Sequence, residues 1–180
     1  WSCPSGARII TVGSFKSQKN HSLLLKAFAK LNITDAKLMF VGEGKGRKSL
    51  SLLVEELGLA DKIIFAGFQT DTTPFYLTAD LFVLSSNYEG FGNVLLEALI
   101  NGVNIVSTDC KSGPAEILSN GKGGILFKSG SVDSLKENYV KFKRLNEKEI
   151  YLQKVCSKKV SSNYTKFRHF KKLNSFFNEA

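Results

Sequence analysis

Two glutamates, Glu89 and Glu97, flank a glycine-containing turn and the predicted start of a helix. Gly90 and Gly92 stand on either side of Phe91, and glycine allows backbone N–H groups to approach a ligand closely. A helix start adds unpaired N–H groups that favour phosphate, and carboxylates accept hydrogen bonds from sugar hydroxyls. The combination favours a sugar-phosphate or nucleotide-sugar ligand. A surface loop followed by an ordinary helical glutamate remains the alternative that spacing alone leaves open.

The predicted helix over residues 93–101 places both glutamates near one ligand. Asn93 is expected to be the N-cap, since asparagine accepts a hydrogen bond from the first free helical N–H groups. Glu97 lies one turn beyond Asn93 and should therefore sit near the mouth of the site. A second glycine-containing stretch, residues 42–49, fits neither a P-loop nor the dinucleotide-binding pattern.

Six short apolar runs alternate with helical patterns along the chain. Because the runs are nearly continuous in hydrophobicity, they predict parallel strands covered on both faces. Right-handed crossovers then give an α/β, doubly wound parallel sheet of the Rossmann-like type, with helices at the C-terminus. The expected strands are 8–13, 37–42, 62–67, 81–85, 104–107 and 124–127, and the expected helices are 20–31, 46–58, 73–79, 93–101, 113–119 and those from about 131 onward, with breaks near Asn146 and Ser162.

Ligands of such sheets bind beyond the carboxyl ends of the strands, so five loops should gather at one edge. The chain has 180 residues, of which 43% are apolar and 23% charged, a composition typical of one globular domain. No window approaches 18 apolar residues. The chain starts without Met, which is expected of a processed chain or a piece of a longer one.

Cysteine and histidine usage argues against a metal site. The three cysteines are far apart, which predicts reduced thiols and a cytoplasmic location. The two histidines, His21 and His169, lie in polar or basic stretches, and no Asp-x-Asp pair occurs. We therefore expect no metal and no cofactor.

Residues 136–172 carry the whole excess of positive charge. The chain has a formal charge of +9, and this segment alone holds twelve basic and three acidic residues. An anionic membrane surface and a solvated helical face are both open interpretations. Aromatic residues in the segment have the spacing of an amphipathic stripe rather than a base-stacking platform, so no nucleic acid is expected.

The segment from Glu89 to Glu97, Glu-Gly-Phe-Gly-Asn-Val-Leu-Leu-Glu, resembles the E-x7-E signature of retaining glycosyltransferases of family GT4. Further matching segments appear in order over most of residues 8–135, among them Phe40-Val-Gly-Glu-Gly44 and Gly113-Pro-Ala-Glu-Ile-Leu118. The family has the GT-B architecture of two Rossmann-like domains. The resemblance implies that this chain is the C-terminal, nucleotide-sugar-binding half, and that it works without a metal.

The resemblance also implies roles for individual residues. Glu89 would contact donor-sugar hydroxyls, Glu97 would bind the ribose, and Lys19 would neutralise the diphosphate. Glu89 and Lys19 are thus the expected catalytic residues. The implied nucleotide-sugar site comprises Gly13, Ser14, Lys19, Phe68 beside the base, Glu89, the backbone of Gly90, Phe91 and Gly92 along the sugar, the N–H groups of Asn93 and Val94 at the diphosphate, and Glu97.

Ser14 departs from the family pattern, which often has arginine directly after the glycine of the first strand. The phosphate clamp would lose one charged, bidentate donor at this position. Lys16, two residues later, is a candidate to compensate.

These expectations describe the donor-binding domain of a retaining glycosyltransferase. It would move a sugar, with a UDP-sugar as the expected donor, to a glycan or lipid-linked acceptor. The expected partners are the nucleotide sugar, a missing N-terminal acceptor domain and an anionic membrane at its cytoplasmic face. Residues 1–135 would form the donor domain, with 136–180 packed on it as a basic helical segment. A non-catalytic nucleotide-binding or interaction module and a nucleotide-sugar epimerase of related architecture are the alternatives.

Overall fold

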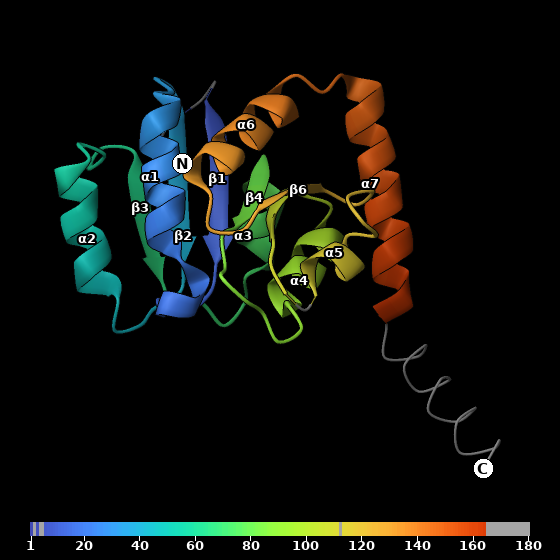
Figure 1. The fold of residues 1–180 in the computed structure, drawn as a ribbon, viewed down its shortest axis with the longest axis horizontal. Helices are drawn as coiled ribbons and strands as arrows, with labels where there is room; N and C mark the ends of the chain where they lie inside the picture. Colours follow the sequence, from blue (N-terminus) through green and yellow to red (C-terminus); the bar gives the residue numbers. More distant parts are fainter. Residues whose placement is uncertain (2, 4–5, 112, 165–180) are drawn as a thin grey trace, which may run out of the picture.

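The computed structural model describes residues 1, 3, 6–111 and 113–164. Its centre is a parallel sheet of six strands in the order β3-β2-β1-β4-β5-β6 (Figure 1). The α/β, doubly wound Rossmann-like fold expected from the alternating pattern is therefore confirmed. The strands are β1 (Ala7–Val12), β2 (Ala36–Val41), β3 (Ile63–Gly67), β4 (Leu81–Leu84), β5 (Asn104–Asp109) and β6 (Ile125–Lys128).

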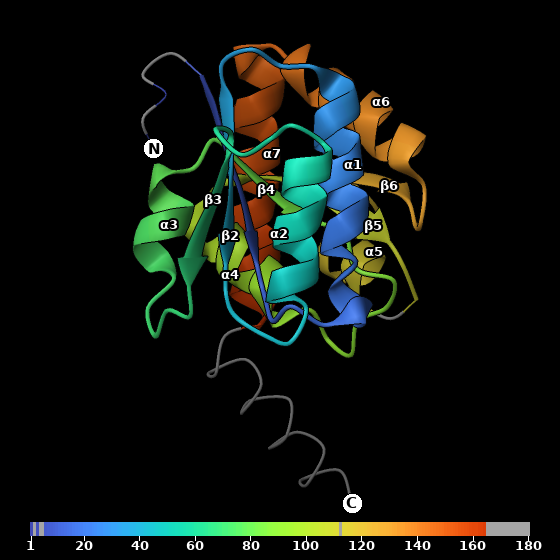
Figure 2. The same ribbon diagram turned by 90° about the vertical axis from the view of Figure 1, so that its left-hand side faces the viewer.

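Helices cover both faces of the sheet (Figure 2). One face packs against α1 (His21–Leu31), α2 (Arg47–Glu56) and α6 (Val132–Lys143). The other face packs against α3 (Thr73–Thr78), α4 (Asn93–Asn101), α5 (Pro114–Ile117) and α7 (Glu147–Ser161). Two short 3-10 turns complete the described elements, η1 (Ser17–Lys19) and η2 (Ser162–Tyr164).

The direction of strand addition reverses between β1 and β4, which are neighbours in the sheet although two strands separate them in sequence. Chain connections on the two sides of this point lead away from each other, so a crevice is left at the carboxyl ends of these strands. The loops that follow β1 and β4 carry Lys19 and Glu89, respectively. The topology thus brings the two sides of the predicted site together.

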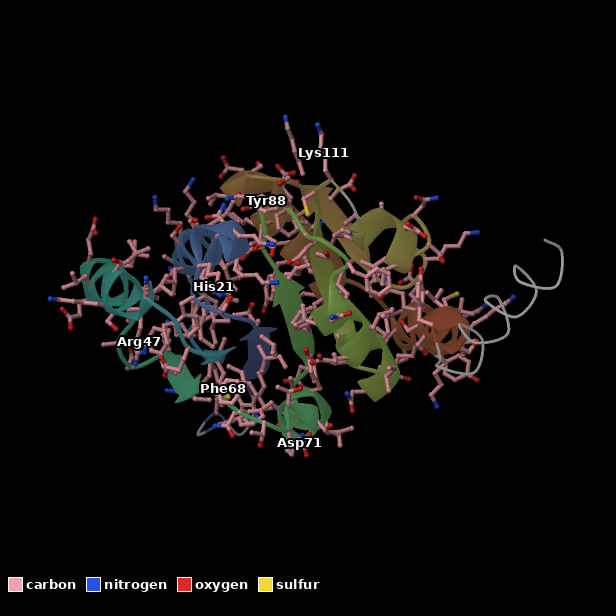
Figure 3. All side chains as sticks on the ribbon, turned by 90° about the horizontal axis from the view of Figure 1, so that it is seen from below. His21, Arg47, Phe68, Asp71, Tyr88 and Lys111 are labelled. Carbon is pink, nitrogen blue, oxygen red and sulfur yellow. The ribbon has the colours of Figure 1, made fainter. Side chains whose placement is uncertain are left out.

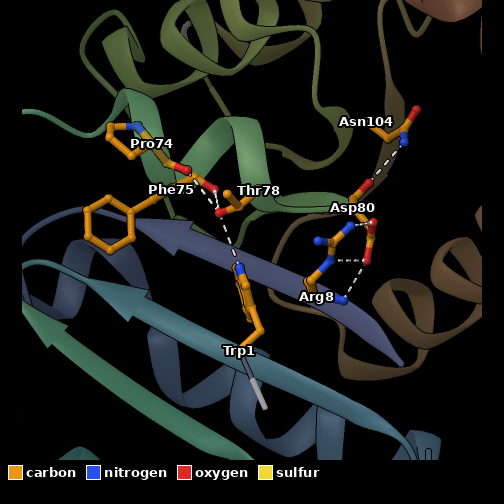
Figure 4. A network of polar contacts seen from close by, with 7 residues as sticks. All are labelled: Trp1, Arg8, Pro74, Phe75, Thr78, Asp80 and Asn104. Atoms are coloured by element: carbon orange, nitrogen blue, oxygen red, sulfur yellow. Dashed lines mark hydrogen bonds and ion pairs between the residues drawn. The ribbon is translucent and has the colours of Figure 1, made fainter. Parts of the chain in front are cut away.

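A polar network ties the amino ends of three strands (Figure 4). Arg8 and Asp80 form an ion pair of 2.7 Å, and the backbone N–H of Arg8 also donates to Asp80 at 2.8 Å. Asn104 donates to the Asp80 carbonyl at 2.9 Å. Partial burial opposes the charged carboxylate, but the hydrogen bonds and charge of Arg8 together hold the pKa of Asp80 below its usual value. These bonds fix where β1, β4 and β5 begin.

Several element ends differ from the expected ranges. The helix expected at 46–58 ends at Glu56, and Gly58 follows it with a left-handed φ of 66°. β5 continues to Asp109, two residues beyond the expected end, because it pairs with β6 over that length. The break near Asn146 is confirmed, since this residue and Glu149 form a capping box at the start of α7.

The expected boundary between residues 135 and 136 falls inside α6. Leu135 and Tyr139, on either side of it, are buried in the same core cluster. α7 contributes Val160 to the core cluster on the other face of the sheet. The last part of the basic segment, residues 165–180, lies outside the described residues, so His169 and four of the twelve cations do too.

Candidate functional site

The expected site lies at the carboxyl edge of the sheet, which Figure 3 shows facing the viewer, with Tyr88 and Lys111 on one side and Phe68 and Asp71 on the other. Hydrogen bonds hold the loop after β1 and the loop after β4 together at this edge. The backbone N–H of Asn87 donates to the Gln18 carbonyl at 2.8 Å, and the side-chain amide of Gln18 donates to the Tyr88 carbonyl at 3.0 Å. The loop after β1 is thus fixed against the loop after β4.

Lys19 and Glu89 form a nearly buried ion pair between these two loops. The Lys19 Nζ lies 2.8 Å from Glu89 Oε1, and their side chains are only 14% and 5% exposed. Ser86 donates to the same carboxylate oxygen at 2.6 Å. Three N–H bonds are available to an ammonium group, so Lys19 keeps donors for a further anion. Both hydrogen bonds end on Oε1 of Glu89, so its Oε2 takes part in neither of them.

Gly13 allows Lys19 to lie across the end of β1. A Cβ atom at this position would lie 3.2 Å from the Cε of Lys19, and Gly13 has a φ of 152°. A side chain here would therefore be strained and would also displace the lysine. The positive φ and the close approach of Lys19 thus both favour glycine at the strand end.

The start of α4 differs from the expectation for Asn93. The N-cap is Gly92, which has a left-handed φ of 79°, and Asn93 is the first helical residue, with an exposed side chain. The prediction of Asn93 as N-cap was wrong because the turn needs a positive φ, which glycine adopts at little cost. The first-turn N–H groups of Asn93 and Val94 lack partners within the helix, as at any helix start.

Glu97 lies one turn into α4 and is held by two hydroxyl groups that the motif does not contain. Thr72 Oγ1 donates to Glu97 Oε2 at 3.1 Å. The Tyr76 hydroxyl lies 3.2 Å from the same oxygen and 3.2 Å from the Val94 carbonyl, so its proton is shared between two acceptors. Burial, with the charge of Glu97 added, raises the pKa of Tyr76, so its hydroxyl stays a donor. Oε1 of Glu97 is left outside these bonds.

A cavity of about 180 Å³ opens at this edge among the loops that follow β1, β2 and β3. Gly13 and Ser14 line it on the side of Lys19, and Thr72 lines it on the side of Glu97. Phe68 also contributes to the wall, and its side chain is 72% exposed. The remaining lining residues are Val12, Val41, Gly42, Glu43 and Gln69. Of the expected site residues, Gly13, Ser14 and Phe68 thus line this cavity, whereas Lys19, Glu89 and Glu97 do not. Those three lie in the neighbouring loops after β1 and β4 and in the first turns of α4.

The loop after β5 closes the site behind Phe91. Gly113 has a φ of 112°, and a Cβ atom there would lie 2.9 Å from the Phe91 carbonyl oxygen. Cys110 is buried beside Glu89, and burial together with the charge of that carboxylate raises the pKa of the thiol. Phe91 itself is 49% exposed, and its ring packs edge-on against Tyr164 with the ring centroids 5.7 Å apart.

His21 does not have the polar surroundings that its sequence neighbours suggested. Its ring is buried between Phe15 and Phe40, with both ring centroids 5.4 Å away in edge-to-face geometry. Burial lowers the pKa of His21 to about 4, and the nearby charge of Lys19 adds to this effect. The imidazole is therefore a neutral core group beneath the loop after β1.

Sequence reasoning missed the residues that hold the two glutamates. The three residues are Ser86, Thr72 and Tyr76. They lie before the motif from Glu89 to Glu97 in the sequence and are not part of it. The one available signal was position, because Ser86 and Thr72 lie in loops that follow strands of a parallel sheet. Their donor roles depend on contacts between separate loops.

A larger cavity, of about 570 Å³, opens at the opposite edge of the sheet and is lined by Arg8, Asp80, Lys143 and Lys154 among others. We place the site at the carboxyl edge because ligands of doubly wound sheets bind there and the motif residues gather there. Among the described residues, no cluster of three or more His, Cys, Asp or Glu side chains could hold a metal ion. In the same part of the chain, no helix has the length and apolar character to span a bilayer.

Known proteins resemble this chain in sequence and in fold. It is 36% identical over 127 residues, 71% of its length and 34% of the other protein, to N-acetylgalactosamine-N,N'-diacetylbacillosaminyl-diphospho-undecaprenol 4-alpha-N-acetylgalactosaminyltransferase of Campylobacter jejuni. It is 29% identical over 169 residues, 93% of its length and 43% of the other protein, to N-acetyl-alpha-D-glucosaminyl L-malate synthase of Bacillus anthracis. The chain thus spans between a third and a half of these relatives.

The fold has solved counterparts of the GT-B type. The crystal structure of Anabaena Alr3699/HepE in complex with UDP superimposes with a TM-score of 0.88 at 20% identity, covering 97% of this chain and 49% of that one. The family model described as Glycosyl transferases group 1 matches residues 5–157. This match spans most of the chain, including all six strands and the motif from Glu89 to Glu97. The chain therefore belongs to the glycosyl transferases group 1 family, as a C-terminal, Rossmann-like domain of the GT-B type.

Proposed function

We propose that this chain binds the nucleotide-sugar donor of a retaining, metal-independent glycosyltransferase, with a UDP-sugar as donor. The observation that carries the proposal is the arrangement of Glu89, Lys19 and Glu97 around the start of α4. Solved relatives of this fold carry UDP or UDP-glucose, which supports the choice of nucleotide. The family assignment favours neither an epimerase nor a non-catalytic module.

In this proposal, three sets of groups bind different parts of the nucleotide-sugar donor. Glu97 accepts hydrogen bonds from the ribose through the oxygen that Thr72 and Tyr76 leave open. The N–H groups of Asn93 and Val94 and the ammonium of Lys19 bind the diphosphate. Glu89 accepts from the sugar through Oε2, while the backbone from Gly90 to Gly92 lies along the ring.

The chemistry follows from where charge develops. As the bond between the anomeric carbon and the diphosphate breaks, negative charge grows on the nucleotide diphosphate and the sugar becomes oxocarbenium-like. Lys19 and the positive end of α4 stabilise that charge without reorganisation, because the ion pair with Glu89 already holds Lys19 in place. The acceptor hydroxyl attacks from the face that the diphosphate leaves. Retention of configuration follows.

We propose a glycan or lipid-linked molecule as acceptor, bound by a preceding domain of the complete protein. The relative from Campylobacter jejuni, whose name specifies a diphospho-undecaprenol substrate, supports a lipid-linked acceptor. A location at the cytoplasmic face of a membrane is part of this proposal. The domain by itself binds donor but transfers little sugar.

Titration calorimetry with UDP and a panel of UDP-sugars tests donor binding. We expect binding by the wild type and a loss of about tenfold or more for Glu97→Gln, because a charged acceptor for the ribose is removed. Glu55→Gln, an exposed carboxylate on α2, is the matched control and should bind like wild type. Equal affinity for folded Glu97→Gln and wild type would refute the role of Glu97.

A transfer assay on the complete protein tests the reaction itself. The anomeric configuration of the product, read by NMR from the coupling constant of the anomeric proton, should match that of the donor. Activity should persist in the presence of EDTA. An inverted product or a strict requirement for a divalent cation would contradict the proposed mechanism.

A further inference from the structure

The outward face of α7 carries large apolar side chains where a surface helix normally carries polar ones. Tyr151 is 67% exposed, Leu152 is 51% exposed and Val155 is 45% exposed. Val155 is four residues from Tyr151 and three from Leu152, so the three side chains lie within about 100° of one another around the helix. α7 forms the right-hand edge of the molecule in Figure 1. We call these three side chains the apolar strip of α7.

The opposite side of α7 explains why the strip faces outward. Val160 is buried in the core cluster, and Ser157 is buried and donates to the Gly123 carbonyl at 3.0 Å. These positions lie about half a turn from the apolar strip, so the helix cannot rotate to cover it without exposing its own core contacts. The strip is therefore a second apolar face that the fold of the described residues leaves uncovered.

Lysines lie at both ends of the apolar strip and along its Tyr151 side. Lys148, Lys154, Lys158 and Lys159 are all exposed, and none of them forms an ion pair within the part of the chain that the structure describes. The acidic residues of α7 are confined to its first turn, where Glu149 is engaged in the capping box. Positive charge therefore dominates the middle and end of this surface.

This composition fits an anionic lipid surface better than a protein partner. Lysine is depleted in protein–protein interfaces, whereas its long stem can lie along apolar groups while its ammonium reaches a phosphate. Tyrosine is favoured at the level of lipid headgroups, where its ring and its hydroxyl meet different environments. A helix lying in the interface combines such an apolar strip with flanking cations.

We propose that the outward face of α7 docks onto a bilayer rich in anionic phospholipid, with the apolar strip inserted at the headgroup level and the four lysines contacting lipid phosphates. The surface lies on the α3, α4, α5 and α7 side of the sheet rather than at the carboxyl edge. Docking therefore leaves the donor site open to the proposed acceptor domain. It does not rest on donor binding, which UDP titration measures separately.

Flotation with vesicles tests the surface in the complete protein that contains this chain. Vesicles of phosphatidylcholine with phosphatidylglycerol at 3:1 should carry the protein in low salt, and phosphatidylcholine alone should not. The variant Lys148→Glu/Lys158→Glu/Lys159→Glu should lower partitioning at least tenfold, since each cation contributes near the anionic surface. Tyr151→Ser/Leu152→Ser/Val155→Ser should lower it about tenfold and reduce binding that persists in high salt.

The matched control is Lys26→Glu/Lys48→Glu/Lys136→Glu, which changes net charge equally on the opposite side of the sheet, where all three lysines are exposed. It should float like wild type. Equal loss in the control, or no loss in the α7 variants, would overturn the proposal. So would a wild-type dimer in analytical ultracentrifugation that the α7 variants make monomeric, because a second copy would then cover the strip.

A fluorescence measurement reports insertion directly and does not depend on a loss of vesicle binding. Tyr151→Trp in a Trp1→Phe background should shift its emission to the blue on adding anionic vesicles. Lys48→Trp in the same background, on the far side of the sheet, should not shift. An unshifted Trp at position 151 with vesicles that bind the protein would overturn insertion by this face.

Discussion

Lys19 and Glu89 are 70 residues apart in sequence, yet their charged atoms lie 2.8 Å apart at the edge of the sheet. The pair joins the loop after β1 to the loop after β4, the two strands between which the direction of strand addition reverses. Each side chain is more than four-fifths buried. The two expected catalytic residues are thus held by each other before any donor arrives.

A double-mutant cycle on this pair should show strong coupling. Lys19→Met, Glu89→Gln and the double variant, unfolded in urea, should give a coupling free energy of about 1–3 kcal/mol, because each single change leaves a buried charge or dipole poorly paired. The exposed pair of Lys30 and Asp133, at 3.0 Å, is the control and should give a coupling near zero. Equal coupling in the two cycles would contradict the structural role of burial.

Removing the hydroxyl of Tyr76 should weaken nucleotide binding through Glu97. Tyr76→Phe deletes a donor to Glu97 Oε2 but keeps the buried ring, so we expect a stability loss of about 1 kcal/mol. Affinity for UDP should fall about fivefold, because the carboxylate is less firmly oriented. Binding of uracil alone, measured by the same calorimetry, should change little. A purely structural role would instead lower stability and leave UDP affinity unchanged.

Restoring the arginine that the family often carries should tighten the phosphate site. Ser14 lines the cavity beside Gly13, so Ser14→Arg places a guanidinium at the end of β1. Affinity for UDP should rise about tenfold, and the gain should shrink in high salt, because the guanidinium adds a charge-assisted bond to the diphosphate. Ser17→Arg, an exposed change of equal charge on η1, is the control. An equal gain there would show that only general attraction was measured.

Stability should fall in mild acid because of His21. Its pKa is lowered from 6.5 to about 4 by burial, so the unfolded chain binds a proton below pH 6.5 that the folded chain does not. The stability from the neutral ring is complete above pH 6.5 and is lost as the pH falls towards 4. Between pH 7 and pH 4.5 the loss should be about 2–3 kcal/mol.

Urea unfolding at the two pH values measures this loss, and His21→Phe provides the comparison. The phenylalanine ring suits the edge contacts with Phe15 and Phe40 and cannot titrate, so the variant should lose less stability in acid than wild type. The same acid dependence in both proteins would show that other groups are responsible.

Local sequence patterns determine much of the fold. Continuous apolar runs separated by amphipathic helices require a parallel sheet covered on both faces, and this is a property of hydrophobic periodicity within each segment. The position of the loops follows, because parallel strands place all their carboxyl ends at one edge. The motif from Glu89 to Glu97 could likewise be located from its own residues and spacing.

Contacts between loops were decided only by the tertiary structure. The hydroxyls on Glu97, the partner of Glu89 and the buried ring of His21 all depend on which side chains meet across segments distant in sequence, a matter of packing that no local pattern encodes. The N-cap is Gly92 rather than the expected Asn93, because the turn before α4 requires a residue with a left-handed φ. The uncovered strip on α7 emerged in the same way, since its pattern shows two apolar faces and only the assembled sheet decides which one is buried.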